Sequence, residues 1–202
     1  MLNITNECNM QLMARYEDKH FDLAIVDPPY GIGDKKLTQG GTWAKKYKTG
    51  DAAWDIAPNL EYFNELFRVS KNQIIWGANY FGLPATRCFL IWDKLQTFPN
   101  FSAAEYLWTS FDSPSKIFKR NNTLCEPNKI HPTQKPIKLY QWILDKYAKP
   151  NDKILDTHLG SGSIAIACHD YNFDLTACEL DKEYYDKAMQ RINNHINQTK
   201  LF

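Results

Sequence analysis

The 202 residues of this chain carry a net charge of +1, and 44% of them are hydrophobic. That length accommodates one folded domain with a sizeable core. A nearly neutral chain is not a uniformly basic nucleic-acid binder, so any basic surface must be local. The five cysteines form no C-x-x-C pair, which argues against a zinc site and favours reduced thiols. No stretch resembles a membrane span, and the polar N-terminal segment lacks a secretory pattern, so we expect a cytoplasmic protein without a metal or a membrane anchor.

Strands and helices alternate along the chain. Apolar runs predict strands over residues 3–8, 21–26, 73–76, 88–92, 106–111, 153–156 and 174–178. Helical spacing predicts helices through residues 12–16, 58–70, 136–147 and 164–167, and from 181 to 196 with Asp181 as N-cap. Such alternation is typical of an α/β fold with a doubly wound, mostly parallel, seven-stranded sheet.

A proline-rich tetrad, Asp27-Pro28-Pro29-Tyr30, follows the predicted strand 21–26. It should therefore lie at the carboxyl end of a strand, where open α/β sheets bind their ligands. An ionised aspartate accepts hydrogen bonds from an amino group. The prolines offer carbonyl acceptors without an N–H donor, and a tyrosine ring can stack on a nucleobase. These residue types predict a site for an amino group on a planar heterocycle; a rigid turn after a core strand is the alternative.

A glycine turn and a distant acid form a second pattern. The predicted strand 153–156 runs into Gly160-Ser161-Gly162 and then a helix, so that backbone N–H groups point towards one place. Glu179 ends the next predicted strand, where an acid suits the two hydroxyls of a ribose. The pattern predicts a nucleoside site, or a tight turn that needs glycine for packing. Beside an amino-group site, a nucleoside cofactor favours transfer to an amine over the hydride transfer of an NAD-dependent dehydrogenase.

Three motifs together resemble those of the DNA methyltransferases that methylate amino groups with S-adenosyl-L-methionine. The tetrad is similar to their D/N/S-P-P-Y/F catalytic motif, and residues 156–163 are similar to their D-P-F-x-G-S-G-T cofactor loop. Residues 131–136, His-Pro-Thr-Gln-Lys-Pro, are similar to an H-P-[TA]-x-K-P segment. The resemblance covers residues 3–195 and departs at Thr157-His158, where the family has Pro-Phe.

The order of these motifs, catalytic first and cofactor last, resembles the circularly permuted β class of the family. The resemblance implies a Rossmann-like methyltransferase fold in which strand 3–8 lies beside strand 174–178 and the termini are near one another.

The resemblance also implies an activity and a set of site residues. A methyl group would move from S-adenosyl-L-methionine to adenine N6 of a flipped base, while Asp27 and the Pro28 carbonyl accept the amine hydrogens and Tyr30 stacks on the base. Lys135 is expected to pair with the cofactor carboxylate, and a solvated loop lysine is the alternative. The predicted catalytic residues are Asp27, Pro28, Pro29 and Tyr30. The predicted cofactor-binding residues are His131, Thr133, Lys135, Asp156, His158, Gly160, Ser161, Gly162 and Glu179.

Two stretches with little periodicity, 31–57 and 112–130, are expected to be mobile loops that face double-stranded DNA within a single domain over residues 1–202. Both carry more basic than acidic residues, although such runs can also be merely solvated. The predicted DNA-binding residues are Lys35, Lys36, Lys45, Lys46, Lys119, Arg120 and Asn121.

Other readings of the same motifs stay open. Cytosine N4 methylation uses the same amine chemistry; RNA or protein-glutamine methylation, or a non-catalytic DNA-binding partner of an active methyltransferase, fits the motifs less well. The resemblance also allows a homodimer, and either a restriction–modification system or a stand-alone or phage-borne enzyme.

Overall fold

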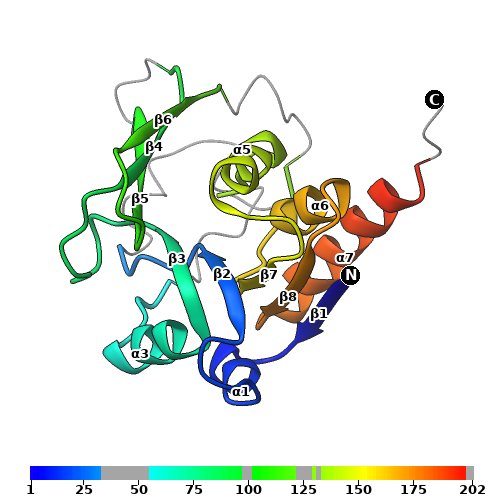
Figure 1. The fold of residues 1–202 in the computed structure, drawn as a ribbon. Coiled ribbons are helices and arrows are strands. Elements are labelled where there is room, and N and C mark those ends of the chain that lie inside the picture. The colour runs from blue at the N-terminus through cyan, green and yellow to red at the C-terminus, as the bar shows by residue number, and fades with distance from the viewer. Residues whose placement is uncertain (33–54, 97–101, 122–128, 131–132, 199–202) are drawn as a thin grey trace.

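The computed structural model describes residues 1–32, 55–96, 102–121, 129–130 and 133–198. These residues form an eight-stranded sheet in the order β1-β8-β7-β2-β3-β5-β4-β6 (Figure 1). The strands are β1 (Leu2–Asn6), β2 (Phe21–Val26), β3 (Ser70–Trp76), β4 (Phe89–Asp93), β5 (Ala104–Thr109), β6 (Lys116–Lys119), β7 (Lys153–Asp156) and β8 (Asp174–Glu179). The helices are α1 (Asn9–Met13), α3 (Leu60–Val69), α5 (Ile137–Tyr147), α6 (Ser163–Asp170) and α7 (Lys182–Ile196).

Most of the sheet is parallel, which confirms the predicted α/β fold. The strands β1, β8, β7, β2 and β3 all run in one direction, whereas β5 is antiparallel to both β3 and β4. The eighth strand corrects the prediction of seven strands, because β6 lies inside 112–130, a stretch predicted to be irregular. It pairs with β4, and Phe118 packs against Trp142 at a ring-centroid distance of 5.5 Å.

The first and last strands of the chain are neighbours. β1 pairs with β8 in parallel, from Leu2 opposite Leu175 to Asn6 opposite Glu179, and the two strands lie side by side in Figure 1. The predicted pairing of the N-terminal strand with the strand that ends at Glu179 is therefore confirmed. The carboxyl end of β1 consequently reaches the same region as the carboxyl end of β8.

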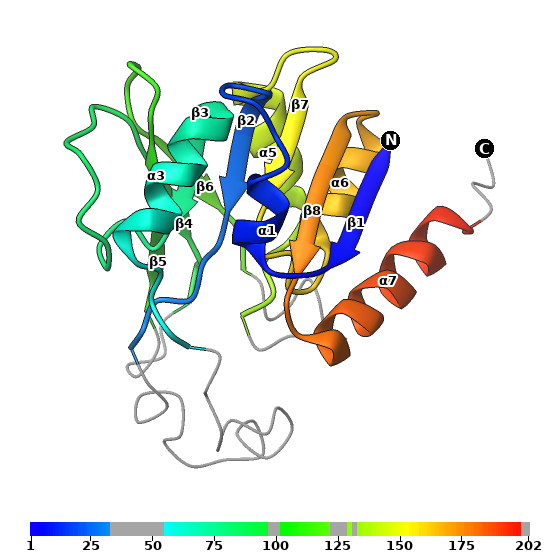
Figure 2. The ribbon, with the colours of Figure 1, turned by 90° about the horizontal axis from the view of Figure 1, so that it is seen from below.

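Helices cover both faces of the sheet (Figure 2). Alternate residues of β2 point to opposite faces, as the twofold side-chain period of a strand requires. Ile25 belongs to the core shared with α5, α6 and α7, whereas Val26 belongs to the core shared with α1 and α3. A strand buried on both faces reads as a continuous apolar run, which is why β2 was recognisable in the sequence.

The carboxyl ends of β1, β2, β3, β7 and β8 lie at one edge of the sheet. The ends of β4 and β6 lie at that edge as well, because the antiparallel β5 reverses direction between β3 and β4. For the same reason the start of β5, with Glu105, is at this edge. In Figure 2 the arrowheads of β2 and β8 point to it. None of the helices in the described ranges has the length and hydrophobicity needed to cross a membrane.

Candidate active site

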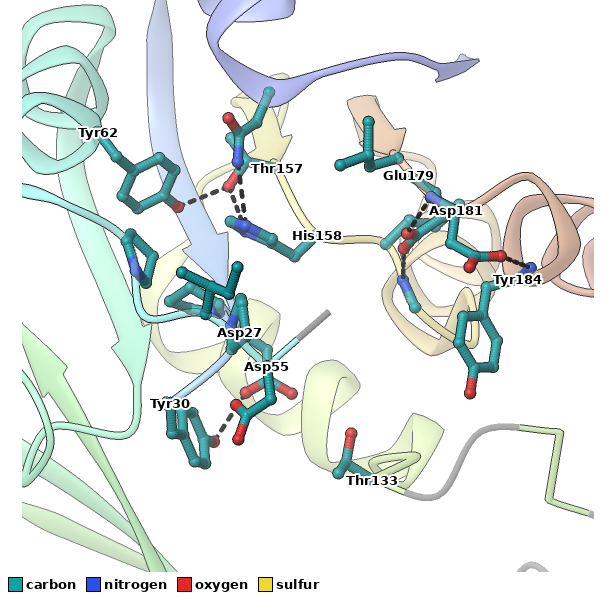
Figure 3. A pocket seen from close by; sticks show the side chains of 18 of the residues that line it. Asp27, Tyr30, Asp55, Tyr62, Thr133, Thr157, His158, Glu179, Asp181 and Tyr184 are labelled. Carbon is teal, nitrogen blue, oxygen red and sulfur yellow. Dashed lines mark hydrogen bonds between the residues drawn. The ribbon is translucent and has the colours of Figure 1, made fainter. Parts of the chain in front are cut away.

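A cavity of about 580 Å³ opens at the carboxyl edge of the sheet (Figure 3). Its lining includes the tetrad Asp27–Tyr30, the turn Thr157–Ser161, Glu179, and the segment Glu7–Met10 that joins β1 to α1. A volume of this size suits a drug-sized ligand or cofactor. The two sequence patterns, which lie more than a hundred residues apart in the chain, therefore line one cavity.

Asp27 is held from both sides of its carboxylate. Its Oδ1 accepts a hydrogen bond from the Tyr30 hydroxyl at 2.8 Å, and its Oδ2 accepts one from the Lys135 ammonium at 2.7 Å. Burial raises the pKa of Asp27, and the adjacent Lys135 charge opposes that rise. Burial and the Asp27 charge raise the pKa of Tyr30 well above its usual value, so this hydroxyl keeps its proton. Pro28 and Pro29 line the cavity beside Asp27.

Lys135 lines the cavity and belongs to a buried cluster of charges. Its side chain is 4% exposed, and its Nζ lies 3.2 Å from Glu105 Oε2 and 4.7 Å from the centroid of the Trp76 ring. Glu105 also binds Lys94 at 2.5 Å. Burial works against charging these groups, yet the opposite charges prevail, raising the pKa of Lys135 and lowering that of Glu105. The predicted pairing of Lys135 with a cofactor carboxylate stays a prediction, and a cofactor would compete with Asp27 and Glu105 for this ammonium.

The ring of Tyr30 lies between the turn after β3 and another aromatic ring. It stacks on Tyr80 with a centroid distance of 4.8 Å and an interplanar angle of 17°. Gly77 has φ +74°, and a Cβ there would lie 2.5 Å from Cε1 of Tyr30. Glycine is thus required for the turn to approach the ring so closely.

Two backbone N–H groups hold Glu179, one from the glycine turn and one from the N-cap residue of α7. Gly160, with φ +54°, donates its N–H to Glu179 Oε2 at 2.8 Å, and Asp181 donates its N–H to Oε1 at 3.0 Å (Figure 3). Burial raises the pKa of Glu179. The predicted N-cap of α7 is confirmed, since Asp181 Oδ1 accepts the N–H of Tyr184 at 2.9 Å.

Gly162 packs against α7. It is the N-cap of α6 with φ +73°, and a Cβ there would lie 2.8 Å from Cδ1 of Ile192 in α7. It does not belong to the cavity lining, whereas Gly160 and Ser161 do. Helix packing alone is enough to require glycine at this position, and the predicted cofactor role of Gly162 stays a prediction.

Thr157 and His158 form a hydrogen-bonded chain along the cavity wall. The Asn9 amide nitrogen lies 3.0 Å from His158 Nε2, His158 Nδ1 lies 2.9 Å from Thr157 Oγ1, and Thr157 Oγ1 lies 2.6 Å from the Tyr62 hydroxyl. Burial lowers the pKa of His158 to about 3, so its ring is neutral at pH 7. Because an amide nitrogen only donates, Nε2 accepts and Nδ1 carries the proton.

Asp156 ends β7 beneath this wall. Its side chain is 2% exposed, and its Oδ1 accepts the N–H of His158 at 3.0 Å. Burial raises the pKa of Asp156 to about 8. Asp156 does not belong to the cavity lining, and its hydrogen bond to His158 supports the turn.

Several residues that line the cavity lie outside the sequence motifs. Asn9, Asp55 and Tyr62 all line the cavity (Figure 3 labels the last two), and Asp55 Oδ1 accepts the N–H of Gly31 at 2.8 Å. The predicted pairing of β1 with β8 was a usable signal for Asn9, because it brings the end of β1 to the site. No comparable signal marked Asp55 or Tyr62.

The remaining predicted residues fall into three groups. Thr133 lines the cavity. Lys119 ends β6 at the same edge of the sheet as Asp27, and Arg120 and Asn121 follow it. The Asn121 side chain donates to the Leu95 carbonyl at 3.1 Å. The residues outside the described ranges are His131, Lys35, Lys36, Lys45 and Lys46. Across the part of the chain that the structure describes, no three His, Cys, Asp or Glu side chains gather as a metal site would require.

Comparisons with known proteins point in one direction. A family model described as DNA methylase matches residues 75–190. The chain is 32% identical to Type II methyltransferase M.BglII of Bacillus subtilis, covering 98% of this chain and 71% of that protein.

Two solved structures share the fold. The complex of M1.HpyAVI with SAM superposes with a TM-score of 0.64 at 20% identity, covering 96% of this chain and all (100%) of that one. The PvuII DNA methyltransferase, described as cytosine-N4-specific, superposes with a TM-score of 0.61 at 12% identity, covering 98% and 92%. These likenesses confirm the predicted Rossmann-like methyltransferase fold.

Proposed function

Because this chain belongs to the DNA methylase family, we propose that it transfers a methyl group from S-adenosyl-L-methionine to adenine N6 in double-stranded DNA. One observation carries the proposal. The carboxylate and prolines of the Asp27–Tyr30 tetrad line the same cavity as the glycine turn and Glu179. Groups that can accept the hydrogens of an amine therefore line the same cavity as groups that can bind a nucleoside.

The chain offers a fitting cavity for the cofactor. The missing Cβ of Gly160 leaves that backbone open: among the described residues other than its two chain neighbours, the His158 carbonyl oxygen is nearest to where it would be, at 3.9 Å. Glu179 Oε2 accepts the N–H of Gly160 and Oε1 accepts that of Asp181, and a carboxylate has further lone pairs with which it could accept a ribose hydroxyl. When bound there, S-adenosyl-L-methionine supplies an electrophilic methyl group on a sulfonium that leaves as a thioether. The SAM complex of M1.HpyAVI, which shares the fold, supports this choice.

The tetrad activates the amine by accepting its hydrogens. An exocyclic amino group is a weak nucleophile because its lone pair is delocalised into the ring. When the Asp27 carboxylate and the Pro28 carbonyl accept the two hydrogens, the nitrogen turns towards tetrahedral geometry and its lone pair becomes available. The carboxylate also stabilises the positive charge that develops on nitrogen as the methyl bond forms, before a proton is lost to solvent. The base must leave the duplex to reach this depth.

Cytosine N4 is the second candidate acceptor. Its amino group presents the same two hydrogens to the tetrad, and the cytosine-N4-specific PvuII enzyme shares the fold. The aspartate at the first position of the tetrad is what favours adenine.

The arrangement of the chain extends the proposal. The catalytic motif precedes the cofactor loop and β1 lies beside β8, which supports a circularly permuted methyltransferase domain that spans residues 1–202. We assign the DNA-facing role to residues 31–57 and 112–130, supported by the position of Lys119–Asn121 at the catalytic edge of the sheet. A homodimer and a place in restriction–modification stay predictions.

The test is methylation of DNA by the purified protein, with nucleosides separated by mass after digestion. We expect N6-methyladenine from the wild type, and none from Asp27→Ala, while cofactor binding by calorimetry persists. Asp22→Ala is the matched control, because Asp22 lies at the opposite end of β2 and binds Lys71 at 2.6 Å. Full activity of Asp27→Ala refutes the mechanism. If the wild type produces N4-methylcytosine, the acceptor is cytosine N4 and not adenine N6. If the wild type produces no methylated nucleoside, the proposed function is refuted.

A further inference from the structure

Asp27 belongs to a cluster of charged side chains that also contains Lys135 and Glu105, and the proposed chemistry assigns a role only to Asp27. Lys135 lies between two carboxylates, 2.7 Å from Asp27 Oδ2 and 3.2 Å from Glu105 Oε2, with only 4% of its side chain exposed. The Trp76 ring, fully buried, faces the same ammonium at 4.7 Å. Lysine bears a strongly hydrated charge, so burying it is costly unless the charge is paired. Such a lysine is poorly placed to release its partners in order to bind a mobile ligand.

We propose that Lys135 is a positioning residue for the catalytic carboxylate, which it keeps ionised and oriented towards the target amine. This inference rests on the proposed function, since it concerns how Asp27 accepts the amine hydrogens. It replaces the cofactor-carboxylate role that the sequence suggested for Lys135. Glu105, itself bound to Lys94 at 2.5 Å, fixes the far side of the ammonium.

The charge of Asp27 decides its chemistry. As a carboxylate it only accepts hydrogen bonds, whereas a protonated carboxyl group would present an O–H donor to an amine that must itself donate. Burial favours the protonated form, and an opposite charge at hydrogen-bond distance favours the ionised one. The ionisable groups that act on Asp27 or are acted on by it are Lys135, Glu105, Tyr30, Tyr62, Tyr140 and Asp156. Lys135 is the cation among them, so no other group in this set can replace its effect.

The same geometry leaves Asp27 free to act. Lys135 and the Tyr30 hydroxyl each occupy one lone pair, on Oδ2 and Oδ1 respectively. A carboxylate oxygen has two such sites, so each oxygen can still accept an amine hydrogen. Two fixed donors prevent rotation of the carboxylate, which preorganises that acceptor.

The test measures the pH dependence of kcat for Lys135→Met and for its matched control, Lys135→Arg. Without the ammonium, the acidic limb of the profile should move up by about 1–3 pH units, the range over which a nearby opposite charge shifts a carboxylate. Activity lost at pH 7 should return at higher pH. The arginine variant retains the charge and should keep the limb close to that of the wild type. The dissociation constant of S-adenosyl-L-methionine should be unchanged in both.

An acidic limb that stays in place while cofactor affinity falls tenfold or more would overturn the proposal in favour of the cofactor role. A second measurement needs neither turnover nor a folded Lys135→Met variant. Infrared difference spectra of the wild type against Asp27→Asn report the carboxylate band of Asp27 directly. An ionised Asp27 at pH 7 supports the proposal and a protonated one refutes it, whether or not the protein methylates DNA.

Discussion

Replacing Gly77 with alanine perturbs the contact between the turn after β3 and Tyr30. Gly77 has φ +74°, and a Cβ there would lie 2.5 Å from Cε1 and 2.8 Å from Cδ1 of the Tyr30 ring. The left-handed backbone conformation costs an alanine roughly 1–2 kcal/mol. Forcing a methyl group into a packed ring adds about 1–3 kcal/mol. We therefore expect Gly77→Ala to lower the free energy of unfolding by roughly 2–5 kcal/mol.

Denaturant unfolding measures this loss, and the chain contains a matched control. In the part of the chain that the structure describes, a Cβ on Gly82, five residues further on, would meet no atom within 4 Å apart from its chain neighbours, so Gly82→Ala should stay within about 0.5 kcal/mol of the wild type. Removing the ring separates the two costs. In a Tyr30→Ala background, Gly77→Ala should retain only the conformational part, giving a coupling energy of about 1–3 kcal/mol. Strictly additive losses would refute the clash, and a neutral Gly77→Ala would refute both parts of the reasoning.

Two further predictions concern the other end of the cavity. Glu179→Gln leaves one acceptor oxygen where the carboxylate offers two. Because charge-assisted bonds of roughly 1.5–3 kcal/mol are lost, calorimetry should show the dissociation constant of S-adenosyl-L-methionine rising by about 10- to 150-fold. Unchanged affinity would show that Glu179 does not bind the ribose. Asp156, with its pKa raised to about 8 by burial, contributes stability below its unfolded pKa that is lost as pH rises through 8. Asp156→Asn should therefore gain stability relative to the wild type between pH 4 and 8, on the order of a few kcal/mol by denaturant unfolding, and a gap independent of pH would contradict this.

Local sequence was sufficient for most of the fold because the central strands are buried on both faces. The run that forms β2 was predicted over residues 21–26, and the structure has it as Phe21–Val26. The missed strand, β6, has only four residues, and its Ile117 is 55% exposed. Its existence depends on pairing with β4 across more than twenty residues of chain. Periodicity within so short a segment could not reveal that pairing.

The site shows the same division between local and long-range information. The tetrad and the glycine turn are each set by one strand and the turn after it, so their motifs predicted that both lie at the carboxyl edge of the sheet. The partners of Lys135 depend instead on the direction of β5. Only because β5 runs antiparallel to β3 does Glu105, near its start, lie at the catalytic edge. The motif around Lys135 could not reveal whether this lysine binds Asp27 and Glu105 or a cofactor carboxylate.

The departure from the family pattern at Thr157-His158 is explained by one hydrogen bond. With His158 neutral and Nε2 accepting from Asn9, its Nδ1–H needs an acceptor, and Thr157 Oγ1 provides it at 2.9 Å. The Pro-Phe pair of the family needs no such bond, because neither side chain has a polar group. A proline at 157 beside His158 would leave a buried donor unpaired, at a cost of about 1–3 kcal/mol. A phenylalanine beside Thr157 would leave the hydroxyl with only the Tyr62 hydroxyl at 2.6 Å. Thr157 and His158 therefore satisfy each other's hydrogen bonding. Together they place polar groups on a cavity wall where the family motif has proline and phenylalanine.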